Sequence, residues 1–227
     1  MRRGGSIASS FRLAKSFDVS VVTAVDEFIP IGLWKEEAGP IDGPRREAVM
    51  PSSDRVPHID FVLGGARSGK TSVALARAEA SGLAPVMVAT ARAFDAEMEA
   101  RIAAHRAERG ASWGLVEEPT ALAAVLVREA RPDRLLVVDC LTLWLTNVLL
   151  GEGDVEASIA ELATTLPALG GPVVLVSNEV GLGIVPDNAL ARRFRDLQGR
   201  LNREIARVAD RVTLVVAGLE VVVKLPR

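Results

Sequence analysis

The chain has 227 residues and a formal net charge of -2 at pH 7; 25% of its residues are charged and 49% are hydrophobic. This composition is ordinary for a globular protein with a substantial core, and the near-neutral charge argues against nucleic acid as an obligate partner. No apolar run approaches the roughly 18 residues needed to cross a bilayer, so we expect no membrane insertion. The only cysteine, Cys140, leaves no internal disulfide, which fits a reducing compartment.

Residues 1–57 differ from the rest of the chain, because short apolar pieces are scattered there among glycines, prolines and charged residues. No long apolar stretch follows Met1-Arg2-Arg3, so we expect no secretory signal. We interpret this part as a poorly ordered N-terminal extension or linker. One alternative is a start codon assigned too far upstream, with Met50 nearer the true start. A weaker alternative is that residues 21–25 add an edge strand to a sheet.

From His58 onward, apolar runs of strand length alternate with segments of helical periodicity. The pattern predicts an α/β domain over residues 58–227 with a mainly parallel central sheet and helices on both faces. Ligands of such sheets bind at the carboxyl ends of the strands, so functional residues are expected just after them. The expected strands are Ile59–Leu63, Pro85–Thr90, Leu135–Cys140, Val173–Ser177, Val212–Ala217 and Val221–Leu225, the last of them antiparallel. The expected helices are Lys70–Ala80, Asp95–Arg109, Thr120–Ala130, Leu141–Leu150, Val155–Leu169 and Asn188–Ala209.

The first expected strand runs into the motif G-x-x-x-x-G-K-[ST], and an alanine-rich helix follows. A strand, a glycine-rich loop and a helix in this order are the context of a phosphate-binding P-loop. Lys70 would reach the outer phosphates and the Thr71 hydroxyl would bind Mg2+, whereas the alternative is an ordinary glycine-rich turn. The motif therefore predicts a P-loop NTPase-type three-layer fold that binds a nucleoside triphosphate. Its residues are Gly64, Gly65, Ala66, Arg67, Ser68, Gly69, Lys70 and Thr71.

Two more expected strands end in polar residues. The apolar run before Asp139 matches the Walker B pattern, in which a carboxylate helps to hold Mg2+. The alternative is an aspartate that caps the helix beginning near Leu141. Thr90 follows another strand and would face a nucleotide there, although an ordinary loop start explains it as well. No Asn-Lys-x-Asp motif occurs in the sequence, which argues against a regulatory GTPase.

His105 lies on a charged helix, where its spacing places it on one face with Met98 and Ile102. A lone helical histidine is usually a surface or packed residue. The functional alternative is a nucleophile or base, because an imidazole is largely neutral at pH 7.

The segment 178–186 follows the strand at 173–177 and holds Glu179 beside two glycines and a proline. It is either a functional loop or a long connection to the last helix, and the residues alone name no role for it. That helix is rich in arginine, and we interpret it as a solvated face because acidic residues interrupt the basic ones.

The stretch from Phe61 to Lys224 resembles the bifunctional adenosylcobinamide kinase / adenosylcobinamide-phosphate guanylyltransferase family of cobalamin biosynthesis. Thr71 stands in place of the usual serine, and Asp139 where glutamate also occurs; both keep the needed oxygen. Ala104 stands where some members carry a second histidine. The residues that carry the resemblance are Gly64–Lys70, Ala89–Ala91, the helix with Asp95, Glu97, Met98, Arg101, Ile102, His105 and Arg106, Trp113 with Glu117, Asn178–Gly181 with Gly183–Pro186, and the arginine-rich segment 192–202.

The resemblance implies two successive reactions. The γ-phosphoryl group of ATP or GTP moves to the aminopropanol hydroxyl of adenosylcobinamide, and GMP from GTP then moves to that phosphate through a guanylyl-histidine at His105, with Lys70 also catalytic. It further implies Mg2+ bound by Thr71 and Asp139, guanine N–H groups accepted by Glu117, and a cytoplasmic homotrimer assembled through one edge of the sheet. Beyond the P-loop, the nucleotide site would comprise Ala89, Thr90, Ala91, Arg106, Glu117 and Asp139.

Two alternatives to the bifunctional enzyme remain. One is a member of the family with a single activity, either the kinase or the guanylyltransferase. The other is a non-catalytic P-loop regulator in which His105 is inert.

Overall fold

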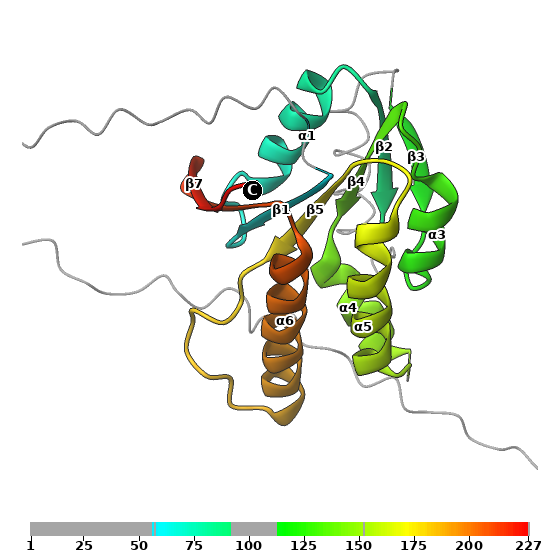
Figure 1. Ribbon diagram of the computed structural model, residues 1–227. Helices are drawn as coiled ribbons and strands as arrows, with labels where there is room; N and C mark the ends of the chain where they lie inside the picture. Colours follow the sequence, from blue (N-terminus) through cyan, green and yellow to red (C-terminus); the bar gives the residue numbers. More distant parts are fainter. Residues whose placement is uncertain (1–55, 57, 92–112, 152, 227) are drawn as a thin grey trace, which may run out of the picture. The chain divides into compact units, whose positions relative to one another are not determined.

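A computed structural model describes residues 56, 58–91, 113–151 and 153–226 (Figure 1). The expectations for the N-terminal extension and its possible edge strand, and for the helix Asp95–Arg109, fall on residues outside these ranges. The domain boundary at residue 58 therefore stays a prediction. Among the described residues, no helix is both long enough and apolar enough to cross a membrane.

The described residues form one seven-stranded sheet with the order β3-β2-β4-β5-β1-β6-β7. Neighbouring strands are parallel except for β6 and β7, which form an antiparallel hairpin. The predicted mainly parallel sheet and antiparallel last strand are confirmed. The strands are β1 (Ile59–Gly64), β2 (Ala84–Ala89), β3 (Gly114–Glu117), β4 (Arg134–Asp139), β5 (Val173–Asn178), β6 (Arg211–Val216) and β7 (Leu219–Lys224).

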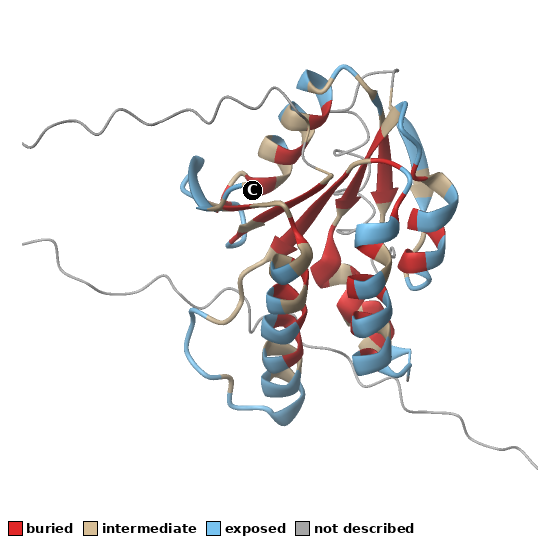
Figure 2. Ribbon diagram, viewed as in Figure 1, coloured by how far each residue is buried: buried red, intermediate tan, exposed pale blue. Residues whose placement is uncertain are grey.

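Side chains of the central strands pack alternately into two apolar clusters on opposite faces of the sheet. In β4, Leu136 and Val138 belong to the larger cluster, whereas Leu135 and Val137 belong to the smaller one. Helix α1 (Lys70–Ala80) covers the smaller cluster. The larger cluster is covered by α3 (Leu122–Glu129), α4 (Leu141–Leu150), α5 (Val155–Thr165) and α6 (Ala189–Val208), whose buried sides face the sheet in Figure 2. The predicted three-layer arrangement is confirmed.

Local sequence accounts for the starts of α5 and α6 and for the end of α5. The side chains of Asp154 and Asn188 accept hydrogen bonds from the first turns of α5 and α6, as N-cap residues do. Helix α5 ends earlier than expected, because residues 166–168 form a short 3-10 turn that contains Pro167, which has no backbone N–H to donate. Strand β3 was not expected. It has only four residues and lies at the edge of the sheet, so it lacks the apolar run that identifies the buried strands.

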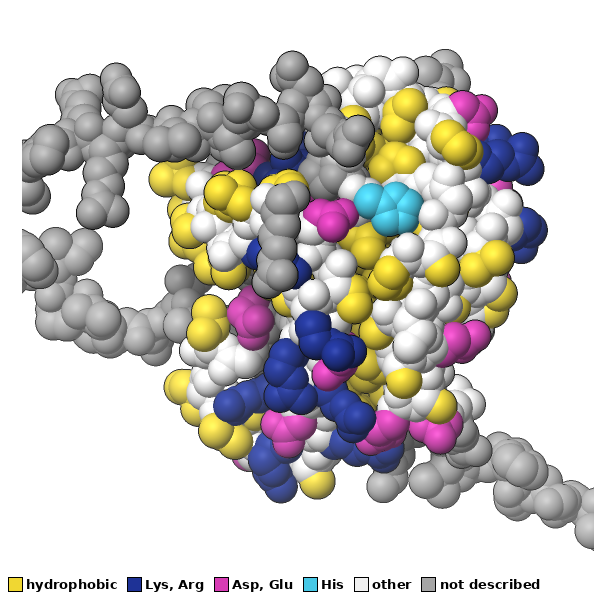
Figure 3. Space-filling model, viewed as in Figure 1, with side chains coloured by type: hydrophobic (Ala, Val, Ile, Leu, Met, Phe, Trp, Pro, Cys, Tyr) yellow, Lys and Arg dark blue, Asp and Glu magenta, His cyan; other side chains and the backbone are white. Residues whose placement is uncertain are grey.

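Helix α6 has the character expected for a solvated basic face. Its inner side is buried at Leu197, Leu201 and Ile205. Arginine side chains gather over the outer side in Figure 3, and acidic side chains lie between them.

A buried carboxylate joins the last two strands to the start of the domain. Asp60 on β1 is 2% exposed, and both of its oxygens accept hydrogen bonds from arginines. Nη1 of Arg77 on α1 lies 2.9 Å from Oδ1, and Nε of Arg211 on β6 lies 3.0 Å from the same oxygen. Arg77 also donates to Thr213 on β6 and pairs with Glu220 on β7. One cluster therefore ties α1, β1, β6 and β7 together.

We predict that Asp60→Ala lowers the free energy of unfolding by about 3 kcal/mol, because it leaves two partly buried guanidinium groups without their carboxylate. The measurement is urea unfolding followed by circular dichroism. Arg207→Ala is the control: it removes the 2.9 Å ion pair with Glu204, in which Arg207 is 72% exposed. The control is expected to cost less than about 1 kcal/mol. Equal losses in the two variants would contradict the role given to Asp60.

Candidate functional site

The predicted site residues from four strands meet at the carboxyl edge of the sheet. Ala89 at the end of β2 pairs with Glu117 on one side and with Asp139 on the other. Gly64 at the end of β1 pairs with Asn178 at the end of β5. Because β5 lies between β1 and β4, the glycine-rich loop and Asp139 are separated by a single strand. This is the edge at which ligands of parallel sheets bind.

The loop after β1 depends on close packing at Gly64. A Cβ atom there would lie 2.3 Å from Ser68 Oγ and 2.7 Å from the carbonyl oxygen of Val215, distances that no side chain tolerates. The loop then turns through Arg67, with a φ of 56°, and Gly69, with a φ of 95°, immediately before α1 begins. The N-terminus of α1 is thereby directed at the space where phosphates would lie.

The β6–β7 hairpin supports this loop from its other side. Gly218 at the turn of the hairpin donates its N–H to the carbonyl oxygen of Ser68, at 2.9 Å. A Cβ atom on Gly69 would lie 3.5 Å from Gly218 Cα, so the two backbones are in contact. Nothing in the sequence indicated this contact, because it joins residues almost 150 positions apart.

Lys70 is the first residue of α1, and its side chain lies against the phosphate loop. It is 9% exposed, and Nζ donates to the carbonyl oxygen of Gly65 at 3.0 Å. Burial lowers the pKa of Lys70, while Cys140 and the negative charge of Asp139 act in the opposite direction. The ammonium group thus lies against the loop through its bond to the Gly65 carbonyl oxygen, which phosphate oxygens would replace with stronger charge-assisted bonds.

Thr71 and Asp139 are suited to Mg2+. The ion prefers oxygen ligands and usually takes only one or two from the protein, with phosphates and water completing its shell. The negative charge of Asp139 partly opposes the lowering of the Lys70 pKa by burial, so its carboxylate lies near the loop. The N-cap position of α4 is Cys140, the residue after Asp139, so the metal role and the capping role of Asp139 both stay predictions. The described residues contain no cluster of three or more His, Cys, Asp or Glu side chains that could hold a metal by themselves.

Thr90 joins the ends of β2 and β4. It is fully buried; its Oγ1 donates to the carbonyl oxygen of Cys140 at 2.7 Å and accepts from the N–H of Cys140 at 3.0 Å. Asn147 on α4 donates to the Thr90 carbonyl oxygen at 2.8 Å. Burial and Asp139 raise the pKa of the Cys140 thiol to about 11, so the thiol is neutral at pH 7. The Thr90 hydroxyl already donates and accepts within the protein, so these bonds do not indicate a nucleotide contact. That contact remains a prediction.

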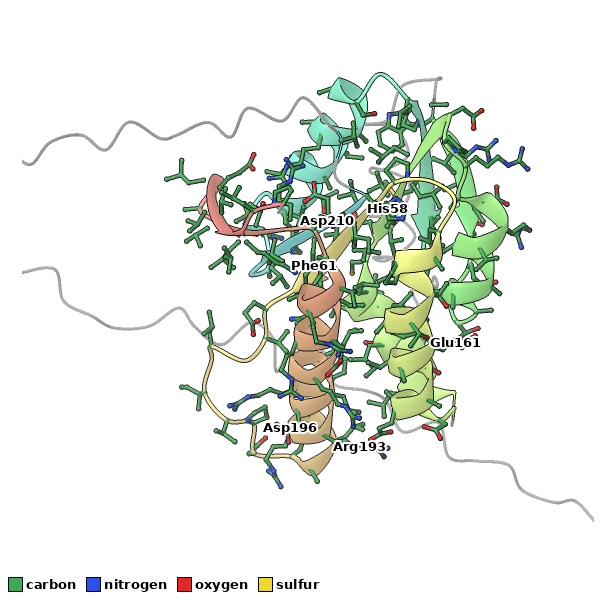
Figure 4. All side chains as sticks on the ribbon, in the orientation of Figure 1. His58, Phe61, Glu161, Arg193, Asp196 and Asp210 are labelled. Carbon is green, nitrogen blue, oxygen red and sulfur yellow. The ribbon has the colours of Figure 1, made fainter. Side chains whose placement is uncertain are left out.

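The other predicted residues are unevenly described. Glu117 is exposed at the end of edge strand β3, and Ala91 is the last described residue after β2. His105 and Arg106 lie outside the described residues. The second histidine, His58, precedes β1 and lies near Asp210 at the amino end of the sheet (Figure 4). The length of β1, roughly 16 Å for six residues, separates it from the phosphate loop.

A polar network at the end of β5 was not foreseen. Glu179 donates its N–H to the carbonyl oxygen of Gly64 at 3.1 Å, so the segment after β5 touches the phosphate loop. Beneath it, Ser177, Gln198 and Asn202 are buried and hydrogen-bonded to one another. The sequence feature that could have indicated this network is the pair Gln198 and Asn202. These two amides are four residues apart, so they lie on the same, otherwise apolar side of the helix.

Comparison with known proteins identifies similar chains. The family model described as cobinamide kinase / cobinamide phosphate guanyltransferase matches residues 60–223. The bifunctional adenosylcobalamin biosynthesis protein CobP of Pseudomonas aeruginosa is 52% identical over 168 residues, which cover 73% of this chain and 96% of that protein. The corresponding CobU proteins of Salmonella typhimurium and Escherichia coli are 39% and 37% identical, and each alignment covers 72% of this chain and 98% of the relative.

We predict that Gly64→Ala lowers the free energy of unfolding by roughly 1–3 kcal/mol, because the added methyl group overlaps Ser68 and the β6 backbone. Gly65→Ala is the matched control, since a Cβ atom on Gly65 has nothing within 4 Å; it should change the stability by no more than about 0.5 kcal/mol. Both are measured by urea unfolding without nucleotide. Equal stabilities of the two variants would show that the packing at Gly64 does not set the shape of the loop.

Proposed function

Because the chain belongs to the cobinamide kinase / cobinamide phosphate guanyltransferase family, we propose that it carries out both reactions on adenosylcobinamide. In the first, ATP or GTP phosphorylates the aminopropanol hydroxyl. In the second, GMP from GTP is transferred to the new phosphate, giving adenosylcobinamide-GDP and pyrophosphate. The observation that carries the proposal is the family match over residues 60–223, which includes the whole phosphate loop and every described strand end at the site.

Both reactions need a nucleoside triphosphate that is held by its phosphates. The loop N–H groups, the N-terminus of α1 and Lys70 supply positive charge at one place, and phosphoryl transfer depends chiefly on such positioning and charge stabilisation. When bound by Thr71 and Asp139, Mg2+ would neutralise charge on the phosphate chain. Lys70 would then leave the Gly65 carbonyl oxygen and bind the outer phosphates.

The second reaction adds a nucleophile from the protein. A neutral imidazole nitrogen of His105 attacks the α-phosphorus of GTP; the N–P bond forms, the bond to the β-phosphate breaks, and pyrophosphate leaves. The phosphate of adenosylcobinamide phosphate then attacks the same phosphorus and releases the histidine. We assign this role to His105 from the family resemblance. The position of His58 at the amino end of β1 supports the choice, because the site lies at the carboxyl end.

Several finer assignments belong to this proposal. Glu117 accepts guanine N–H groups, and Ala89, Thr90, Ala91 and Arg106 contact the nucleotide. A cytoplasmic homotrimer, with the corrinoid as substrate and no nucleic acid as partner, rests on the family resemblance and the near-neutral charge.

The guanylyl-histidine is tested with GTP labelled at the α-phosphate. We expect a covalent label on the unaltered protein that survives base and is lost in acid, as a phosphoramidate should. His105→Ala should carry no label, whereas His58→Ala, the matched control, should be labelled normally. Absence of covalent label despite intact GTP binding would contradict the guanylyltransferase half.

The kinase half is tested separately by following phosphorylated cobinamide. Lys70→Ala should lose both activities because the triphosphate cradle is shared, whereas His105→Ala should keep the kinase. Loss of both activities in a folded His105→Ala protein would refute this division of roles. A wild-type chain active in one assay only would be a single-activity member, and one inactive in both would be a nucleotide-binding regulator.

A further inference from the structure

Glu179 occupies a position that the proposed mechanism does not yet use. It follows β5, the strand that lies between the phosphate-loop strand β1 and the strand β4 that ends at Asp139. Its N–H bonds the carbonyl oxygen of Gly64, so its backbone is fixed to the first residue of the loop. The side chain therefore starts beside the cradle, at the edge of the sheet where the phosphates are expected.

The carboxylate of Glu179 is held by groups on both sides. Oε1 accepts the N–H of Gly181 at 2.8 Å, and Asn202 Nδ2 lies 3.5 Å from Oε2. A Cβ atom on Gly181 would lie 2.9 Å from Oε1, so only glycine leaves the carboxylate where it is. Within the described residues, Glu179 forms no ion pair with a lysine or arginine.

A buried network fixes the amide of Asn202. Its Oδ1 accepts from Ser177 Oγ at 2.8 Å and from Gln198 Nε2 at 2.9 Å, and its Nδ2 donates to the Asn178 carbonyl oxygen at 3.0 Å. Ser177 and Gln198 are fully buried, and Asn202 is 5% exposed. Buried polar groups of this kind add no apolar stabilisation to α6, and Oε1 of Gln198 has no hydrogen-bond partner among the described residues. The hydrogen bonds that the network does make hold the Asn202 amide in one geometry. The alternative is that the network only joins α6 to β5.

We propose that Glu179 is a catalytic residue of the kinase reaction, in which it accepts the proton of the alcohol that attacks the γ-phosphorus. The inference rests on the kinase half of the proposed function. As the bond from the alcohol oxygen to phosphorus forms, the bond from phosphorus to the β-phosphate oxygen breaks; the nucleoside diphosphate leaves, and the alcohol proton passes to Glu179 and then to water. Gly181 and Asn202 are positioning residues that aim the carboxylate.

The guanylyl reaction has no such need. Its first nucleophile is a neutral imidazole, which attacks through a lone pair without losing a proton beforehand. Its second nucleophile is a phosphate monoester, which is already largely ionised at pH 7 because its second pKa is about 6. A base beside the γ-phosphate position therefore affects one activity and not the other, and this difference separates catalysis from a structural role.

The experiment compares Glu179→Gln with the unaltered full-length protein in both assays. We expect kcat for phosphorylation of cobinamide to fall about 100-fold or more, since general base catalysis contributes at least that much, with KM for ATP unchanged. Covalent labelling by α-labelled GTP should keep its normal rate and extent. Glu156→Gln, the same chemical change on the exposed side of α5, should leave both activities unchanged.

A second pair of variants tests the positioning. Gly181→Ala displaces the carboxylate and should lower the kinase kcat roughly tenfold without affecting labelling. Gly183→Ala lies in the same loop, where an added Cβ meets nothing within 4 Å, and should have normal activity.

The outcomes are distinct. Normal kinase activity in Glu179→Gln would overturn the inference, and so would an equal loss of kinase activity and labelling, which would place Glu179 in the shared nucleotide site. If the unaltered protein itself formed no phosphorylated cobinamide, the kinase half of the proposed function would fail, and the inference with it.

Discussion

The phosphate loop is held in shape by two backbone hydrogen bonds that come from opposite neighbours in the sheet. Glu179, after β5, donates to Gly64 at the start of the loop, and Gly218, between β6 and β7, donates to Ser68 near its end. At the first of these bonds, Gly64 packs so closely against Ser68 and Val215 that it has no room for a side chain. The rest of the site depends on this constraint, because loop N–H groups can bind phosphates only if they are aimed before the ligand arrives.

One phosphate-binding loop can serve two reactions if the nucleotide stays in the same position and a different acceptor approaches it in each reaction. In the proposed function, the γ-phosphorus meets an alcohol, and the α-phosphorus meets an imidazole. Glu179, whose backbone is hydrogen-bonded to the loop, is proposed to serve the first acceptor, and His105 the second. If Lys70 and the loop act in both, as proposed, the two group transfers need only one nucleotide site.

Much of this arrangement was predictable from local sequence. The loop, the buried strands and Asp139 follow from apolar runs that end in glycine or carboxylate, and their placement at one edge follows from a parallel sheet. What was missed depends on contacts between distant residues. Strand β3 is short and lies at an edge of the sheet. The hydrogen bond from Gly218 joins segments that are distant in the sequence. A function for the buried amides of α6 can be inferred only once the structure shows that Asn202 contacts Glu179. The role proposed for His105 came from the family resemblance, since its spacing alone suits a surface residue equally well.

The most direct test of a single shared cradle is the inhibition constant of GDP, measured in two assays. In one, GTP serves as phosphoryl donor to cobinamide; in the other, GTP guanylylates the protein in a single turnover. The account predicts competitive inhibition against GTP in both assays with the same inhibition constant, because GDP occupies the same loop each time. Two different constants, or inhibition that is not competitive in either assay, would contradict it and require a second nucleotide site.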